Sequence, residues 1–137
     1  MLRVKRVYTS PEDTDGIRVL VDRLWPRGLS KEAARLDAWL REVAPSPELR
    51  KWFNHEPGKF AEFALRYEAE LTREPAAGEL ARIRQWLEEG SPVTLLYAAK
   101  DERHNHAVVL QEALTRWRTG AGSEGRDSPP FKVGPCI

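Results

Sequence analysis

Two short, nearly continuous apolar runs constrain most strongly what this chain can fold into. They span residues 17–24 and 93–99, and the first contains Val19, Leu20 and Val21 in succession. A strand with one solvated face alternates polar and apolar residues, whereas a strand covered on both faces is apolar throughout. Both runs therefore predict strands inside a sheet that is covered on its two sides.

Segments with helical periodicity and turn residues separate these runs from two weaker strand candidates. We expect the weaker strands at residues 3–8 and, on an ambiguous pattern, 37–43, and helices at residues 31–36, 48–53, 59–72, 79–89 and from about 104 to 117. Strands that alternate with helices predict an α/β fold, here a three-layer sandwich with a small, mostly parallel sheet flanked by helices. The connection at residues 9–16 is too short for a crossover helix, so the first two strands are candidates for an antiparallel pair.

Length and charge limit the organisation of the chain and its partners. A chain of 137 residues predicts one domain, which we place at residues 1–118, followed by a tail rich in Gly, Ser and Pro at residues 119–137. The formal net charge of +1 argues against nucleic acid and an anionic membrane as partners. A small anionic ligand is still a candidate, but a local cluster of basic residues has to bind it. The oligomeric state does not follow from the sequence.

Several kinds of functional site are excluded by the sequence. Cys136 is the only cysteine, which rules out a disulfide framework and a cysteine-based metal site. The sequence contains no Walker A, GxSxG or HExxH motif, and we predict no cofactor. Neither a signal peptide nor a membrane-spanning run is recognisable, so we expect a cytoplasmic protein.

The first polar cluster follows the apolar run at residues 17–24. It contains Asp22, Arg23, Arg27 and Gly28 in one short segment. The planar guanidinium group of arginine pairs with carboxylate or phosphate through two parallel hydrogen bonds, and a glycine lets the backbone approach a ligand closely. The segment is therefore a candidate anion site. An internal ion pair between Asp22 and an arginine, which would fix the turn, explains the same residues equally well.

The second cluster surrounds a predicted helix that begins after Ser46. Free backbone N–H groups at a helix N-terminus attract anions, and Arg50 and Lys51 lie on the same helix. His55 follows where the helix breaks, and an imidazole can act as a general acid or base. The structural alternative is that His55 caps the C-terminus of the helix and that Arg50 and Lys51 form a solvated basic face.

The third cluster follows the apolar run at residues 93–99, where the chain enters the last helix. Ligands of open α/β sheets bind beyond the carboxyl ends of the strands, which makes Tyr97, Lys100, Asn105 and His106 candidates. For His106 the structural alternative is a buried histidine held by hydrogen bonds. His104 and His106 would diverge on a helix, so we predict no metal site.

Three sequence blocks resemble one known family. They are RVLVDRLWPRG at residues 18–28, APSPELRKWFNHEP at residues 44–57 and VTLLYAAKDERHNHAVVL at residues 93–110. In this order they resemble the YeaO-like branch of the domain of unknown function 488 family (DUF488), over roughly residues 3–117. The resemblance implies a bacterial or archaeal cytoplasmic protein with a compact α/β fold and undefined activity. It places family motif positions at Asp22, Arg23, Trp25, Pro26, Arg27, Gly28, His55, Tyr97, Asn105 and His106.

These clusters support three hypotheses about function. In the first, a hydrolase- or transferase-like enzyme acts on a phosphate-bearing or nucleotide-like ligand. In the second, the same pocket binds or senses an anionic ligand without catalysis. In the third, the polar groups only stabilise the core. The candidate catalytic residues are His106, His55 and Asp22. In this hypothesis Asp22 orients Arg23 or a histidine. The candidate ligand-binding residues are Arg23, Arg27, Gly28, Tyr97, Lys100 and Asn105. Both functional hypotheses require the three clusters to meet in one pocket.

Overall fold

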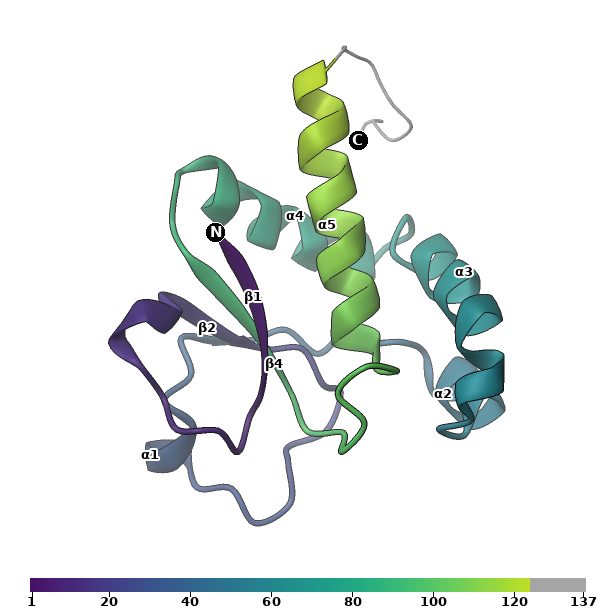
Figure 1. Cartoon of the computed structure of the whole chain (residues 1–137), viewed down its shortest axis with the longest axis horizontal. Helices are drawn as coiled ribbons and strands as arrows, with labels where there is room; N and C mark the ends of the chain where they lie inside the picture. Colours follow the sequence, from purple (N-terminus) through teal and green to yellow (C-terminus); the bar gives the residue numbers. More distant parts are fainter. Residues whose placement is uncertain (124–137) are drawn as a thin grey trace.

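Four parallel strands form one small sheet at the centre of the molecule. The computed structural model describes residues 1–123. The strands are β1 (Leu2–Arg6), β2 (Ile17–Leu20), β3 (Ala38–Trp39) and β4 (Val93–Tyr97), in the spatial order β1-β4-β2-β3. Figure 1 labels β1, β4 and β2. The predicted α/β class with a small parallel sheet flanked by helices is therefore confirmed.

The proposed antiparallel pairing of the first two strands is wrong. Strand β4 lies between β1 and β2, and both pair with it in parallel, so that Leu2 and Ile17 each align with Val93. The connection holds only one short 3-10 helix, η1 (Asp13–Asp15). A crossover helix is unnecessary, because ten extended residues reach about 33 Å and a five-residue strand is only about 17 Å long.

Five α-helices accompany the sheet within residues 1–123. They are α1 (Lys31–Ala34), α2 (Pro47–Phe53), α3 (Phe60–Glu70), α4 (Ala76–Glu88) and α5 (His106–Ser123), and a further 3-10 helix, η2 (Pro57–Lys59), precedes α3. Ser46 caps α2 at the predicted start of that helix, and Ser30 caps α1; the hydroxyl groups of both accept from backbone N–H groups of the first turn. The helix starts were thus readable from these two serines.

Several predicted boundaries differ from the structure; β2, for example, ends at Leu20 and not at residue 24. The ambiguous strand at residues 37–43 is reduced to the two-residue β3, because the chain turns away from the sheet after Trp39. Helix α5 continues to Ser123, past the predicted end at Trp117 and into the predicted tail. Glycine and serine cost a helix only about 1 kcal/mol or less each, so an established helix can extend through them. The rest of the tail, including Cys136, lies outside the described residues.

Alternate residues of the two central strands reach two hydrophobic clusters on opposite faces of the sheet. Val19 and Leu95 belong to the larger cluster, which the sheet forms with α2–α5. Leu20 and Leu96 point to the smaller cluster. Trp25 packs there against Trp39 with ring centroids 5.4 Å apart. Apolar residues on both faces explain why these strands read as continuous apolar runs.

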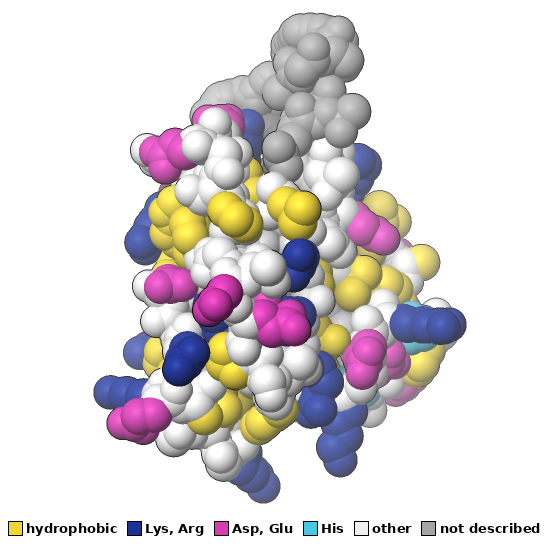
Figure 2. All heavy atoms as spheres, turned by 60° about the vertical axis from the view of Figure 1, so that its left-hand side comes forward, with side chains coloured by type: hydrophobic (Ala, Val, Ile, Leu, Met, Phe, Trp, Pro, Cys, Tyr) yellow, Lys and Arg dark blue, Asp and Glu magenta, His cyan; other side chains and the backbone are white. Residues whose placement is uncertain are grey.

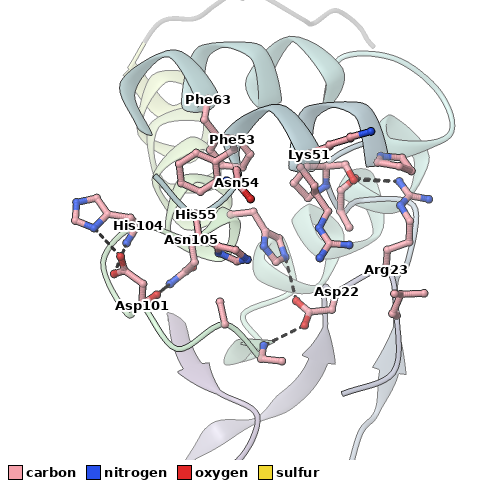
Figure 3. A pocket seen from close by; sticks show the side chains of 18 of the residues that line it. Asp22, Arg23, Lys51, Phe53, Asn54, His55, Phe63, Asp101, His104 and Asn105 are labelled. Atoms are coloured by element: carbon pink, nitrogen blue, oxygen red, sulfur yellow. Dashed lines mark hydrogen bonds and ion pairs between the residues drawn. The ribbon is translucent and has the colours of Figure 1, made fainter. Parts of the chain in front are cut away.

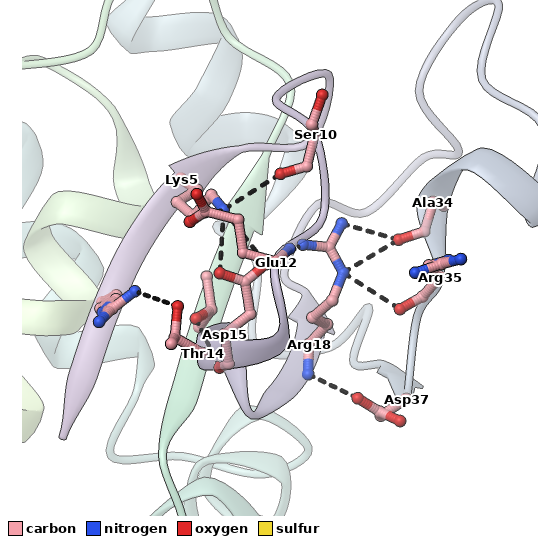
Figure 4. A network of polar contacts seen from close by, with 11 residues as sticks. Lys5, Ser10, Glu12, Thr14, Asp15, Arg18, Ala34, Arg35 and Asp37 are labelled. Carbon is pink, nitrogen blue, oxygen red and sulfur yellow. Dashed lines mark hydrogen bonds and ion pairs between the residues drawn. The ribbon is translucent and has the colours of Figure 1, made fainter.

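A buried polar network joins the start of β2 to its neighbours (Figure 4). The carboxylate of Asp15, 1% exposed, lies between Lys5 Nζ at 2.9 Å and the guanidinium group of Arg18. Arg18, 4% exposed, also donates to the carbonyl oxygens of Ala34 and Arg35. The internal arginine–aspartate pair considered for Asp22 therefore exists at the other end of β2, between different residues.

No helix within residues 1–123 has the length and apolar character needed to cross a bilayer.

Candidate functional site

The three polar clusters contribute to a single pocket beyond the carboxyl ends of β2 and β4. The pocket has a volume of about 810 Å³. Its walls come from residues 22–24 after β2, residues 44–55 around α2, and residues 98–106, which lead from β4 into α5 (Figure 3); Phe63 of α3 completes the lining. This is the position at which open α/β sheets place their ligands.

Asp22 and His106 form the polar contact at the base of this pocket. Nε2 of His106 lies 2.9 Å from the carbonyl oxygen of Val21 and 3.2 Å from Oδ1 of Asp22. The other carboxylate oxygen of Asp22 accepts a hydrogen bond of 3.0 Å from the backbone N–H of Ala98 (Figure 3). Asp22 therefore connects the ends of β2 and β4 with the first residue of α5.

The surroundings of His106 favour one tautomer. Two acceptor oxygens next to Nε2 require the proton on that nitrogen, and the carbonyl of Val21 is the nearer of the two. Oδ1 of Asp22 is buried and accepts no hydrogen bond of good geometry within the described residues. Nδ1 of His106 likewise has no partner there, which leaves it available as an acceptor in the neutral ring. The carboxylate of Asp22 lies beside the imidazole and does not form an ion pair with Arg23.

Basic side chains outnumber acidic ones around the pocket. Of the four cations, Arg50, Lys51 and Lys100 are exposed and form no ion pair within residues 1–123. Among the described residues, two carboxylates line it, those of Asp22 and Asp101. Elsewhere acidic and basic side chains are interspersed, as over the face in Figure 2. A chain with a net charge near zero thus gathers an excess of positive charge at this pocket.

Arg23 differs from the other three cations because it holds the pocket wall. Its Nη2 donates to the carbonyl oxygens of Ala44 and Pro45 at 3.3 and 3.4 Å, and Nη1 lies 3.3 Å from Glu42. Its Nε is buried and has no partner within the described residues. Arg23 fixes the segment before α2, and only part of its guanidinium group can serve a ligand.

The predicted anion site at the N-terminus of α2 is filled from within the protein. The carboxylate of Glu70 accepts from the backbone N–H of Ser46 at 2.9 Å and from its hydroxyl group at 2.6 Å. Glu70 therefore places a carboxylate at this helix end, and the hydroxyl oxygen of Ser46 accepts from the N–H of Leu49 in the first turn. Glu70 lies on α3, far along the sequence, so nothing near Ser46 signalled its presence.

His55 stands at the edge of the pocket in a strained backbone conformation. Asn54 and His55 have φ values of 50° and 55°, a region that residues other than glycine rarely occupy. Asn54, not His55, is the C-cap of α2, so the expected capping role of His55 is wrong. The imidazole is exposed and makes no hydrogen bond within the described residues; its ring lies 6.3 Å from that of Phe53.

The segment between β4 and α5 is shaped by two side-chain caps. Asp101 accepts from the backbone N–H groups of Arg103 and His104, which lowers the pKa of this carboxyl, and it also contacts Nδ1 of His104 at 3.0 Å. Asn105, 3% exposed, accepts from the N–H of Val108 and so caps α5. The N-terminus of a long helix, with its positive dipole, therefore lies at the pocket.

Three predicted site residues do not reach the pocket. Arg27 lies outside it, with its carbonyl oxygen accepting from the hydroxyl group of Tyr8 at 2.6 Å. Gly28 has a φ of 73°, and a Cβ atom at this position would meet no other atom within 4 Å, so the backbone turn explains the glycine better than close approach to a ligand. Tyr97 points into the core, where burial raises the pKa of its hydroxyl group.

The sequence predictions named no apolar residue of the pocket. Leu24, Phe53 and Phe63 line it, and the two phenylalanines also belong to the larger core cluster. Within residues 1–123 no group of three or more His, Cys, Asp or Glu side chains is arranged to hold a metal ion.

Comparison with known protein families identifies one match across nearly all of the chain. Residues 1–131 match the family model described as the inactive DUF488-N3 subclade. The match covers the sheet, all five helices and every segment of the pocket. No solved structure matches the chain significantly.

Two similar proteins come from distant bacteria, and both are described as uncharacterized. YeaO of Escherichia coli (strain K12) is 46% identical over 114 residues, which cover 82% of this chain and 96% of that protein. Rv3073c of Mycobacterium tuberculosis (strain H37Rv) is 44% identical over 113 residues, or 82% of this chain and 92% of that protein. Neither name states an activity.

Proposed function

Because the chain belongs to the DUF488 family, within the subclade described as inactive, we propose that it is a non-catalytic module that binds a small anionic ligand. The observation that carries the proposal is the set of free cations at the pocket. Arg50, Lys51 and Lys100 line it without an ion pair inside the described residues. Charge-assisted hydrogen bonds to carboxylate or phosphate are about twice as strong as neutral ones.

Three further features support an anion as the ligand. The pocket is next to the N-terminus of α5, whose dipole favours negative charge. The carboxylate of Asp22 is turned toward His106 and the N–H of Ala98, which reduces its repulsion of an anion. The exposed ring of His55 can donate to the same ligand when it is protonated.

A hydrolase- or transferase-like activity on a phosphate-bearing or nucleotide-like ligand is the second candidate. The contact between Asp22 and His106 favours it, because a carboxylate that orients an imidazole is a recurring arrangement for general acid–base catalysis. The binding function is preferred because Nε2 is engaged by the carbonyl of Val21 and only Nδ1 is free, and because the family model carries the description inactive.

Isothermal titration with inorganic phosphate at low ionic strength tests the proposal. We expect saturable binding at one site, weakened about tenfold in Lys51→Gln by the loss of one charge-assisted contact. Lys31→Gln is the matched control, since Lys31 is an exposed helical lysine that does not line the pocket. Absence of saturable binding, or equal weakening in both variants, contradicts the proposal.

A turnover assay separates the two candidates. Incubation with p-nitrophenyl phosphate should release no p-nitrophenol above the rate without protein. Release that disappears in His106→Ala would establish the enzymatic candidate and overturn the non-catalytic one.

A further inference from the structure

The pocket is much larger than a bare inorganic anion requires. Its volume of about 810 Å³ lies within the range of about 300–1,000 Å³ that is usual for pockets of organic ligands. A phosphate ion bound by Lys51 and Arg50 would fill a small part of that space. The remaining space needs a ligand with a body as well as a charged head.

The lining beyond the cations is mainly apolar. Pro45, Phe53 and Phe63 contribute from the segment before α2, from α2 and from α3, and Ala98 and Ala99 from the end of β4. Apolar walls with a few charged groups are the usual composition of a pocket for an organic molecule. Water in contact with such walls is released when an apolar group replaces it.

Leu24 is a large apolar side chain of the lining that the fold leaves exposed, as it does the smaller Pro47. Leu24 is 69% exposed, whereas Phe53 and Phe63 are 6% and 2% exposed. Leu65 on α3 is similarly exposed, at 68%, but does not line the pocket. Leu24 therefore offers a ligand apolar contact area that is free in the unbound protein.

On the basis of the proposed function, we propose that the ligand is an organic phosphomonoester with a compact apolar body. The basic residues Arg50, Lys51 and Lys100 bind the phosphate group, and Leu24 contacts the body. This assigns to Leu24 a part in specificity, which distinguishes an organic phosphate from the inorganic ion.

Titrations with phosphate, phenyl phosphate and phenol test the assignment. Phosphate has only the charged group, phenol has only the apolar ring, and phenyl phosphate has both. Phenyl phosphate should bind at least about tenfold more tightly than phosphate, as burial of most of a phenyl ring predicts, and phenol should not bind at the same concentrations. Equal affinity for phosphate and phenyl phosphate would overturn the inference but leave the proposed function intact. Saturable binding of neither anion, or equal binding of phenol and phenyl phosphate, would remove the proposed function itself.

Two leucine variants test the role of Leu24 directly. Leu24→Ala should raise the Kd for phenyl phosphate about three- to fivefold, the effect of removing roughly 30–40 Å² of apolar contact, without changing the Kd for phosphate. Leu65→Ala is the matched control and should change neither value. Both side chains are exposed, so melting temperatures close to that of the wild type should verify that the variants are folded. Equal effects of the two substitutions would contradict a contact between Leu24 and the ligand.

Discussion

Nε2 of His106 lies 3.2 Å from Oδ1 of Asp22, so the junction between β4 and α5 contacts the segment that follows β2. The same aspartate accepts from the backbone N–H of Ala98 after β4. One carboxylate thus holds together the two central strands and α5 at the point where the pocket begins. This contact, more than any single motif, makes one site from residues that are far apart in the sequence.

Asp22→Ala should lower the free energy of unfolding by about 1–3 kcal/mol, because the N–H of Ala98 loses its acceptor in a partly buried position. Urea unfolding gives the value. Asp13→Ala is the control: Asp13 is exposed and its side chain forms no hydrogen bond or ion pair within residues 1–123, so the change should stay within about 0.5 kcal/mol. Similar losses in both variants would show that the Asp22 contact does not stabilise the junction.

Arg23→Gln should destabilise the protein, whereas Arg50→Gln should not. Arg23 donates to the carbonyl oxygens of Ala44 and Pro45, and its loss should cost about 1–2 kcal/mol. Arg50 is exposed and its side chain is free within the described residues. Thermal unfolding gives the melting temperatures of both variants. Equal melting temperatures would contradict the interpretation that Arg23 stabilises the pocket wall and that Arg50 only contacts the ligand.

The stability of the protein should fall in acid because of Asp15. Burial raises the pKa of this carboxyl, but hydrogen bonds from Lys5, the backbone of Glu12 and Arg18 outweigh it and hold the pKa below its ordinary value. A depressed folded-state pKa stabilises the protein above the unfolded-state value of about 4, and this contribution is lost as the pH falls through the folded-state pKa.

The Asp15→Asn variant isolates that contribution. Urea unfolding between pH 7 and pH 2.5 should show a loss of stability in the wild type that is smaller in the variant. The variant should also be less stable at pH 7, by about 3 kcal/mol or more, because Arg18 is left buried without its counter-charge. Parallel pH profiles for the two proteins would show that another group is responsible.

His55→Gly should stabilise the fold and weaken ligand binding at the same time. Glycine relieves the positive φ of 55°, which predicts a gain of roughly 0.5–1 kcal/mol. The imidazole at the pocket edge is lost, so the Kd for phosphate should rise. His55→Ala keeps the strain and should weaken binding without the gain in stability. A loss of stability in His55→Gly would indicate a structural role for the ring.

The sequence predicted those parts of the fold that depend on neighbours along the chain. The apolar runs around Val19 and Leu95 placed the central strands, and Ser30 and Ser46 placed two helix starts. The order of the strands did not follow, because it depends on pairing between distant segments, and an extended return from β1 to β2 leaves no periodic signal. The sequence also did not predict that the chain leaves the sheet after Trp39, because the length of a strand depends on pairing with distant segments.

The candidate site was predictable as three segments but not as a set of contacts. Position at the strand ends indicated Asp22 and His106 correctly as neighbours of a pocket. It equally indicated Arg27, whose segment turns away so that its carbonyl meets Tyr8. Glu70, which belongs to α3, accepts from the backbone N–H of Ser46 at the N-terminus of α2. The sequence around Ser46 cannot indicate a partner that lies so far along the chain.

A titration of the uniformly ¹⁵N-labelled protein with inorganic phosphate, followed by two-dimensional NMR, tests the anion pocket most directly. We predict saturable shifts that concentrate in the backbone amides of residues 22–24, 50–55 and 98–106 and that give one common Kd. The backbone amide signals of exposed lysines outside the pocket, such as Lys31, should not shift. Shifts that spread over such lysines without saturation, or no shifts at all, would contradict a single anion pocket formed by the three segments.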